Sequence, residues 1–289
     1  MQRVLTTLVL VAILVLGCLT GTPASAAVIY FTDESRVLRS NPAGATPVEL
    51  SYSGSSCFAL CVAFDTSTGK IYWTIGCTAP ESSIFRADSS GSNLERVVSA
   101  AIDSAISGIA LNLAQGKIYW AQQDSASAIK RANLNGSSAQ TIVASAGISV
   151  YGVAIDATGG KLYWTTFTDG VAASGKIRRS DLVGQNVTDL VTGLQQPCGL
   201  ALDVGGQKIY WADLGTGKVQ RANLADGQNV ENLVTGVTGV LGISLDLSAG
   251  KMYWTDAAGR KVQRANLNGS NVEDVLTGLN YPSGIVLHP

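Results

Sequence analysis

A pair of adjacent aromatic residues recurs six times along this chain, and this repeat constrains the fold more than any other feature. The pairs are Tyr30-Phe31, Tyr72-Trp73, Tyr119-Trp120, Tyr163-Trp164, Tyr210-Trp211 and Tyr253-Trp254, spaced 42 to 47 residues apart. An arginine follows each pair, at Arg39, Arg86, Arg131, Arg179, Arg221 and Arg264. A repeat in the forties is typical of a β-propeller, in which each repeat forms one blade.

Each repeat encodes four antiparallel strands. An apolar run such as 152–156 precedes the run that holds the aromatic pair, and a tight glycine turn such as Gly159-Gly160 separates the two. After the arginine come an Asn-Gly turn and a fourth short run. Short strands that are apolar on both faces indicate sheets sandwiched between neighbours. We therefore predict an all-β, six-bladed β-propeller over residues 27–289.

The two ends of the chain predict how the ring closes. Val28 to Asp33 has the pattern of the second strand of a blade, whereas Gly284 to Leu287 has the pattern of a first strand without a blade of its own. We expect the C-terminal strand to complete the first blade, because this pairing leaves no exposed sheet edge between the first and last blades.

Residues 1–26 have the pattern of a secretory signal peptide. Arg3 supplies the positive start, residues 4–19 are apolar, and Ala24-Ser25-Ala26 forms a small-residue cleavage site. In a competing interpretation, Cys18 is the acylated cysteine of a lipoprotein. We favour cleavage after Ala26, which predicts a secreted or extracytoplasmic protein, in the periplasm or at the cell surface. No later apolar run is long enough for a membrane span.

Composition excludes several functional classes. The chain has 20 Lys+Arg against 21 Asp+Glu, so it lacks the basic excess of a nucleic-acid-binding protein. An apolar fraction of 46% argues against intrinsic disorder. His288 is the only histidine, so no internal imidazole base or histidine-rich metal site is available. We expect a monomer with no cofactor and no metal.

The Tyr-Trp-Thr-Asp repeats, together with Lys218 to Leu224 and Val272 to Leu279, resemble the low-density-lipoprotein-receptor class B (YWTD) repeats. The resemblance covers residues 27–289 and implies a six-bladed propeller that recognises proteins over one face. It also implies that the motif aspartate fixes the blade edge, often with the repeat arginine. No cysteine-rich module or transmembrane anchor accompanies this propeller, so a stand-alone secreted protein of bacterial origin fits better than an animal receptor.

Loop lengths predict which face binds. The distance from each arginine to the next tyrosine of a pair is 31 to 33 residues, whereas the distance from aromatic pair to arginine varies from 8 to 15. The variation therefore falls between the second and third strands. That loop and the connection from the fourth strand to the next blade share one face, which we call the variable face. The glycine and Asn-Gly turns form the opposite, constant face.

Blades two to four differ from the others on the variable face. Their loops are the longest, at Gly76 to Ser82, Gln123 to Ser127 and Phe167 to Ser174, and Ile75, Gln122 and Thr166 replace the motif aspartate. We predict a recognition surface there for an extracellular protein or surface ligand, with Phe167 and Tyr151 as aromatic anchors near the axial mouth. The candidate residues are Gln122, Gln123, Asp124, Tyr151, Phe167, Thr168 and Asp169. The alternative is neutral loop drift.

Other conspicuous residues have structural interpretations. We expect the Tyr-Trp pairs to pack between blades and not to form sugar platforms, and the repeat arginines to donate structural hydrogen bonds. Carboxylates that close first strands, at Asp65, Asp156, Asp203 and Asp246, suggest turn capping. Glycosylation acceptor triplets occur at Asn135, Asn186 and Asn268.

Four cysteines remain after signal cleavage. Folding the hairpin about residues 67–68 brings Cys57 nearly opposite Cys77, which predicts a disulfide. The spacing of Cys57 and Cys61 also allows a bond. We expect Cys61 and Cys198, at the starts of two first strands, to be unpaired core residues.

An enzymatic alternative is a calcium-dependent, lactonase-like six-bladed hydrolase. Such enzymes hold a metal with oxygen ligands that converge on the axial mouth. The corresponding starts of the first strands here are Leu60-Cys61, Ser107-Gly108, Tyr151-Gly152, Cys198-Gly199, Leu241-Gly242 and Ser283-Gly284. None of these positions carries a carboxylate. The sequence therefore favours a non-catalytic recognition scaffold.

Overall fold

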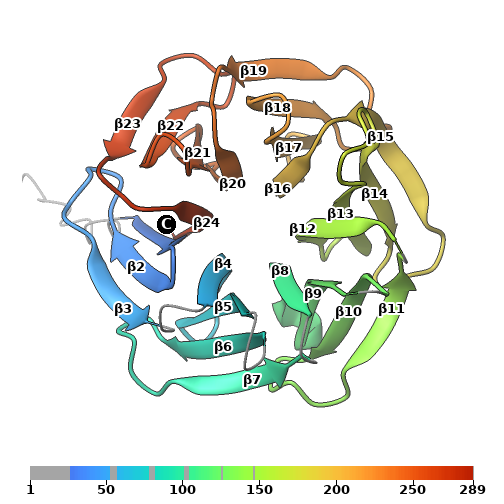
Figure 1. Cartoon of the computed structure of the whole chain (residues 1–289), viewed down its shortest axis with the longest axis horizontal. Helices are drawn as coiled ribbons and strands as arrows, with labels where there is room; N and C mark the ends of the chain where they lie inside the picture. The colour runs from blue at the N-terminus through green and yellow to red at the C-terminus, as the bar shows by residue number, and fades with distance from the viewer. Residues whose placement is uncertain are drawn as a thin grey trace, which may run out of the picture.

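Six four-stranded antiparallel sheets surround a central channel, which confirms the predicted six-bladed β-propeller (Figure 1). The computed structural model describes residues 27–52, 57–77, 82–100, 104–124, 126–145 and 147–288. The signal peptide predicted for residues 1–26 lies outside the described residues.

The strands of each blade run from the channel outward. In order, they are β24 (Pro282–His288), β1 (Val28–Asp33), β2 (Arg36–Ser40) and β3 (Val48–Tyr52) in blade one; β4 (Cys57–Asp65), β5 (Lys70–Cys77), β6 (Ser83–Asp88) and β7 (Glu95–Ser99) in blade two; β8 (Ala105–Asn112), β9 (Lys117–Gln123), β10 (Ala128–Asn133) and β11 (Gln140–Ala144) in blade three; β12 (Ser149–Asp156), β13 (Lys161–Phe167), β14 (Gly175–Asp181) and β15 (Thr188–Leu194) in blade four; β16 (Pro197–Asp203), β17 (Lys208–Asp213), β18 (Lys218–Asn223) and β19 (Glu231–Thr235) in blade five; and β20 (Val240–Asp246), β21 (Lys251–Asp256), β22 (Lys261–Asn266) and β23 (Glu273–Leu276) in blade six.

The C-terminal strand closes the ring as predicted. β24 pairs antiparallel with β1, with Val28 opposite His288 and Phe31 opposite Ile285. The strand is longer than the apolar pattern indicated, because the ladder reaches Pro282. Tyr30 and His288 both stand beside Phe64 of blade two, and the Phe64 ring stacks on each of them. An aromatic stack therefore covers the seam where the two ends of the chain meet.

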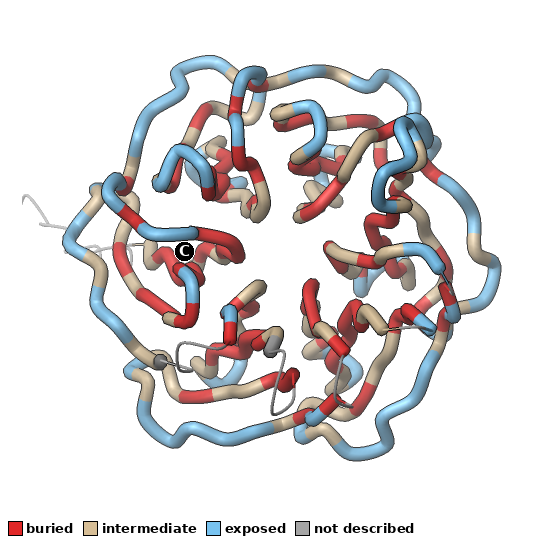
Figure 2. The backbone as a smooth tube through the Cα atoms, viewed as in Figure 1, coloured by how far each residue is buried: buried red, intermediate tan, exposed pale blue. Residues whose placement is uncertain are grey.

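The core consists of apolar layers between adjacent blades. Every tryptophan of the repeat is at most 1% exposed. In the layer between blades four and five, Tyr163 packs in one cluster with Trp211 and Leu200. Figure 2 shows the result: the inner three strands of the blades are mostly buried or half-buried, while exposed residues gather on the outermost strands and loops.

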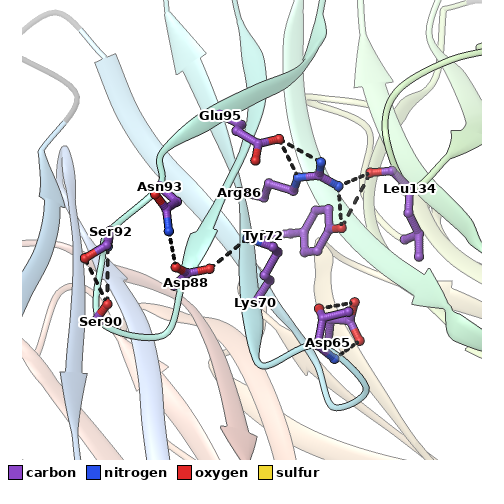
Figure 3. A network of polar contacts seen from close by, with 11 residues as sticks. Asp65, Lys70, Tyr72, Arg86, Asp88, Ser90, Ser92, Asn93, Glu95 and Leu134 are labelled. Atoms are coloured by element: carbon purple, nitrogen blue, oxygen red, sulfur yellow. Dashed lines mark hydrogen bonds and ion pairs between the residues drawn. The ribbon is translucent and has the colours of Figure 1, made fainter.

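The repeat arginines tie each blade to the next. Arg86 of blade two donates from Nη1 to the carbonyl of Leu134 in blade three at 3.2 Å, and its Nη2 pairs with Glu95 at 2.7 Å (Figure 3). The other five reach carbonyls of the following blade in the same way, from Arg39 to Ser89, Arg131 to Leu182, Arg179 to Leu224 and Ala225, Arg221 to Leu267, and Arg264 to Pro42.

Turn-capping carboxylates lie on the constant face. Asp65 accepts hydrogen bonds from the backbone and hydroxyl groups of Ser67 and Thr68, and Asp156 accepts from Gly159 N at 2.7 Å. Asn112 does the same for Gln115 N in the short 3₁₀ turn η1 (Leu113–Gln115), which ends at Gly116 in the left-handed conformation that Gly160 also adopts.

Candidate functional site

A β-bulge near the start of every inner strand shapes the channel. In blade four, Val150 pairs with Thr166 and Val153 pairs with Trp164, so Tyr151 and Gly152 fall outside the regular ladder. Corresponding register shifts occur in all six blades. In five blades the bulge consists of the dipeptide identified in the sequence as a first-strand start, whereas in blade two only Leu60 is bulged and Cys61 pairs with Thr74. All twelve residues of these dipeptides line one cavity.

Glycine at the second bulge position lets neighbouring inner strands approach closely. A Cβ on Gly152 would lie 2.3 Å from the carbonyl oxygen of Cys198 in the next blade. A side chain there would force the blades apart, because real Cβ atoms do not come so close. Cys61 stands at the corresponding position in blade two, and its thiol is free.

The axial cavity has a volume of about 500 Å³ and opens on the variable face. Its deeper walls are aliphatic, with Ile109, Val153 and Leu200 among the lining residues. Its mouth adds side chains from the loops and strand ends of the variable face, namely Gln123, Tyr151, Phe167, Asp169, Gln196, Leu214 and Tyr281. A concave, mostly apolar pocket with a few polar groups at its rim is the usual form of a ligand site.

Loss of the motif aspartate is accompanied by longer strands in blades two to four. The second strands β5, β9 and β13 have eight, seven and seven residues, whereas β1, β17 and β21 have six. The added ladder pairs include Gln123 with Ala105 and Phe167 with Ser149. The predicted loop boundaries at Gly76, Gln123 and Phe167 were therefore wrong, since these residues belong to strands.

Two of the three motif aspartates that remain bind backbone N–H groups of the preceding loop, whereas the third, Asp256, accepts from Gly259 N in the turn that follows it. Asp33 accepts from the backbone N–H groups of Asn280 and Tyr281, and Asp213 accepts from those of Gln195 and Gln196. Each of these two carboxylates thus fastens the loop that enters its own blade. The implied pairing of this aspartate with the repeat arginine was wrong for Asp33, whose ion pair is with Arg36.

The two predicted aromatic anchors lie together at the mouth of the cavity. The rings of Tyr151 and Phe167 stack with their centroids 4.9 Å apart and an interplanar angle of 15°. Phe167 is only 3% exposed, whereas Tyr151 is half-buried. Burial raises the pKa of the Tyr151 phenol, and the nearby acidic groups of Cys198, Asp169 and Tyr281 raise it further. Tyr151 therefore presents a neutral phenol, and Phe167 supports its ring.

Of the three candidate residues in blade three, Gln123 lines the mouth of the cavity, whereas Gln122 and Asp124 are hydrogen-bonded to each other. Gln123 lines the cavity and donates to the carbonyl of Val150 at 2.8 Å. Gln122 is 4% exposed and donates to Asp124 at 2.8 Å. Burial opposes ionisation of Asp124, but hydrogen bonds from Gln122 and Ala126 outweigh it and lower the pKa. Gln122 thus fills the position of the motif aspartate and is not accessible to a ligand.

In the blade-four loop, Asp169 and Thr168 have different surroundings. Thr168 is half-buried, and its backbone N–H donates to the hydroxyl of Ser174 at 3.0 Å. Asp169 is exposed, lines the cavity and accepts one hydrogen bond, from Ser149 at 3.3 Å. Sequence reasoning missed Tyr281, which is 47% exposed and lines the same mouth. Its position three residues before the bulge Gly284 matches that of Ser149 before Gly152, which was a signal in the sequence.

Cys57 and Cys77 lie opposite each other in the hairpin of blade two, as their spacing predicted. Cys57 is the ladder partner of Cys77, while Cys61 is opposite Thr74. The thiols of Cys61 and Cys198 are free, so a bond between Cys57 and Cys61 is excluded. The disulfide between Cys57 and Cys77 stays a prediction.

Within the described ranges, no three His, Cys, Asp or Glu side chains lie close enough together to hold a metal ion. In the same part of the chain, no helix has the length and apolar character needed to cross a membrane.

Known proteins share this architecture. A chain in the crystal structure of a nidogen/laminin complex superimposes with a TM-score of 0.78 at 21% identity, over 90% of this chain and 98% of that one. TolB from Acinetobacter baumannii superimposes with a TM-score of 0.74 at 15% identity, over 92% of this chain and 67% of that one. At these identities the likeness shows the fold.

Family models match both the body of the chain and its last repeat. Residues 250–289 match the low-density lipoprotein receptor repeat class B, as the resemblance predicted. The longer match spans residues 32–256. The chain therefore belongs to the family described as outer membrane protein assembly factor BamB, and its C-terminal repeat is of the low-density lipoprotein receptor class B type.

Proposed function

We propose that this protein is an extracytoplasmic, non-catalytic recognition scaffold that binds a protein partner on its variable face, over blades two to four and the axial mouth. The observation that carries the proposal is the cavity of about 500 Å³, which opens on the face where loop lengths diverge and strands extend. The constant face consists of short turns held by their own carboxylates, so it has little room to vary.

The composition of the mouth supports binding over catalysis. Interface hot spots are typically aromatic residues in pockets, and Tyr151, Phe167 and Tyr281 provide such residues here. A hydrolase of the calcium-dependent type would need several oxygen ligands that converge on the axis. Of the cavity-lining residues only Asp169 carries a carboxylate.

The relatives support a role in assembly with other proteins. One similar chain comes from a nidogen/laminin complex, and the matching family model is described as an outer membrane protein assembly factor. The first description names a complex of two proteins, and the second names a factor in the assembly of outer membrane proteins.

A loop graft tests the proposal. Residues 168–174 of blade four are replaced by residues 214–217, the short corresponding loop of blade five. Phe167 is kept, because it is buried beneath Tyr151. The immobilised protein is then exposed to the extracytoplasmic fraction of its source, and the captured proteins are compared by mass spectrometry. We expect the graft to lose partners that the unaltered protein retains.

The control is a graft on the constant face that keeps the length of the loop unchanged. Residues 182–187 of blade four are exchanged for residues 267–272 of blade six. This control should capture the same partners as the unaltered protein. If the variable-face graft also captures them undiminished, the assignment of the binding face is wrong.

The extracytoplasmic location has its own test. Cleavage after Ala26 predicts that the mature protein begins at Ala27. N-terminal sequencing of the exported protein should find this residue. A lipidated N-terminus at Cys18 would instead support the lipoprotein interpretation.

A further inference from the structure

The described residues that line the axial cavity carry negative charge and no positive charge. Among the described residues that line the cavity, Asp169 is the only one with a carboxylate, and none is a lysine, arginine or histidine. Within the described ranges, no cation lies within ion-pair distance of Asp169, and its one hydrogen bond comes from Ser149 Oγ at 3.3 Å. The other aspartates described on this face are occupied. Asp33 and Asp213 are 0% and 1% exposed and bind loop N–H groups, Asp256 accepts from Gly259 N, and Asp124 accepts from Gln122 and Ala126.

Two tyrosines line the same cavity as this carboxylate, from opposite sides of the ring. Tyr151 belongs to β12 of blade four, and Tyr281 directly precedes β24 of blade one, across the channel in Figure 1. Asp169 and Tyr281 each lie near enough to Tyr151 to contribute to the raised pKa of its phenol, after the larger effect of burial. Phe167 covers one face of the Tyr151 ring, so a ligand in the cavity meets the remaining face or edge. Aromatic faces carry negative potential and attract cations.

The walls below the mouth are aliphatic. Leu60, Leu241 and Ile285 line the cavity together with the valines and isoleucines of the inner strands. A ligand group that fits this arrangement has an apolar stem, a delocalised positive charge and several hydrogen-bond donors. Arginine has these properties: its guanidinium is weakly hydrated, stacks on aromatic rings and binds carboxylates with two parallel hydrogen bonds. The lysine ammonium is compact and strongly hydrated, and it fits an aromatic rim less well.

We propose that the axial mouth is a receptor for one arginine side chain of the bound partner, with the guanidinium paired to Asp169 between Tyr151 and Tyr281. This inference rests on the proposed function and specifies the chemistry that the partner must present. Neither the loop lengths nor the relatives indicate it. It follows from a carboxylate without an ion pair in a cavity that two tyrosines line and to which the described residues contribute no cation.

The test uses two small probes of nearly equal shape. Nα-acetyl-arginine amide carries the guanidinium, and Nα-acetyl-citrulline amide replaces it with a neutral urea. Binding of each to the full mature protein is measured by ligand-observed NMR titration. We expect the arginine probe to bind roughly ten-fold more tightly than the citrulline probe, the size of a charge-assisted hydrogen bond. This preference should shrink as ionic strength rises from about 0.01 to about 0.15 M.

Variants locate the site. Asp169→Asn should reduce arginine-probe affinity to that of the citrulline probe, while leaving the citrulline probe unaffected. Tyr281→Leu should weaken the arginine probe by about two- to five-fold, the size of an exposed cation–π contact. Asp226→Asn is the matched control, because it removes the same charge at an exposed turn of the constant face. It should bind both probes as the unaltered protein does.

Several outcomes would overturn the inference. Equal binding of the two probes, or undiminished arginine binding in Asp169→Asn, would show that the mouth does not recognise a guanidinium. If Nα-acetyl-lysine amide bound as tightly as the arginine probe, the mouth would be a general cation site and not an arginine receptor. Loss of partner capture in the loop graft, combined with failure of the arginine probe, would leave the proposed function standing and remove this inference alone.

Discussion

At the residue scale, the threonine that directly follows the aromatic pair in blades two, four and six joins each of these blades to the next. Gly152 N donates to Thr165 Oγ1 at 2.8 Å, and the same hydroxyl donates to the Cys198 carbonyl of the next blade at 2.8 Å. Thr74 and Thr255 make the same bridge. The threonine therefore satisfies a bulge N–H and a neighbouring carbonyl at once, in a buried position.

Thr165→Val is the corresponding test. The substitution keeps the shape of the side chain but leaves a buried N–H and a buried carbonyl without this partner, so it should lower the unfolding free energy by about 1–3 kcal/mol. Urea denaturation followed by tryptophan fluorescence measures the change. Thr192→Val, at an exposed position of β15, is the control and should change stability by no more than about 0.5 kcal/mol. Equal stabilities for the two variants would show that the bridge contributes nothing.

A second residue-scale prediction concerns Cys198. Burial raises the pKa of its thiol to about 12, and the charge of Asp213 adds to the effect. The thiolate is the reactive form, so folded Cys198 should react with iodoacetamide far more slowly than unfolded Cys198. Because the unfolded thiol ionises first as the pH rises, this group removes stability above its unfolded pKa of about 8.5. Mass-spectrometric labelling of native and urea-unfolded protein at alkaline pH checks the difference in reactivity.

At the element scale, the sequence predicted which segments form strands but not where they end on the variable face. The glycine turns and aromatic runs are local patterns, and they show where the strands lie. β1, β17 and β21 end at the motif aspartate, which is also visible in the sequence. In blades two to four, the ladder continues past that position because Ile75, Gln122 and Thr166 leave the first strand free to pair. This depends on a partner strand, which no local pattern reveals.

The candidate site shows the same division. The repeat register placed Tyr151 and Phe167 near the mouth, but the bulge at Tyr151 decides that the two rings stack and that Phe167 is buried. Tyr281 and Asp169 line one cavity only after the ring has closed. Contacts between residues more than a hundred positions apart cannot be derived from a single repeat.

The extended ladder of blade two yields the element-scale prediction. Because Cys57 and Cys77 are ladder partners and Cys61 is free, non-reducing peptide mapping should find a Cys57–Cys77 disulfide. Reduction should lower the unfolding free energy by about 2–3 kcal/mol, since the bond closes a hairpin. The Cys57→Ala/Cys77→Ala variant is the control and should be insensitive to reductant. Peptides that carry Cys57 as a free thiol would contradict the prediction.

At the scale of the whole molecule, stability depends on closing the ring. β24 supplies the inner strand of blade one, and its Ile285 and Leu287 are buried in a cluster with Phe31 of β1 and Tyr253 of blade six. Removing this strand would expose the inner edge of β1 and one side of two interblade layers. The C-terminal segment thus belongs to the core, unlike an ordinary frayed terminus.

Truncation and permutation together test this closure. Deletion of residues 282–289 should lower the unfolding free energy by more than about 3 kcal/mol, the scale of a large-to-small core substitution, because a whole buried strand is lost. In the matching permutant, a short glycine-rich turn joins His288 to Val28, which are already ladder partners, and the chain is opened between Gly184 and Gln185 on the constant face. The join is an ordinary hairpin connection, so the permutant should unfold cooperatively with nearly unaltered stability. If the truncated protein were as stable as the permutant by urea denaturation, the closing strand would not hold the ring.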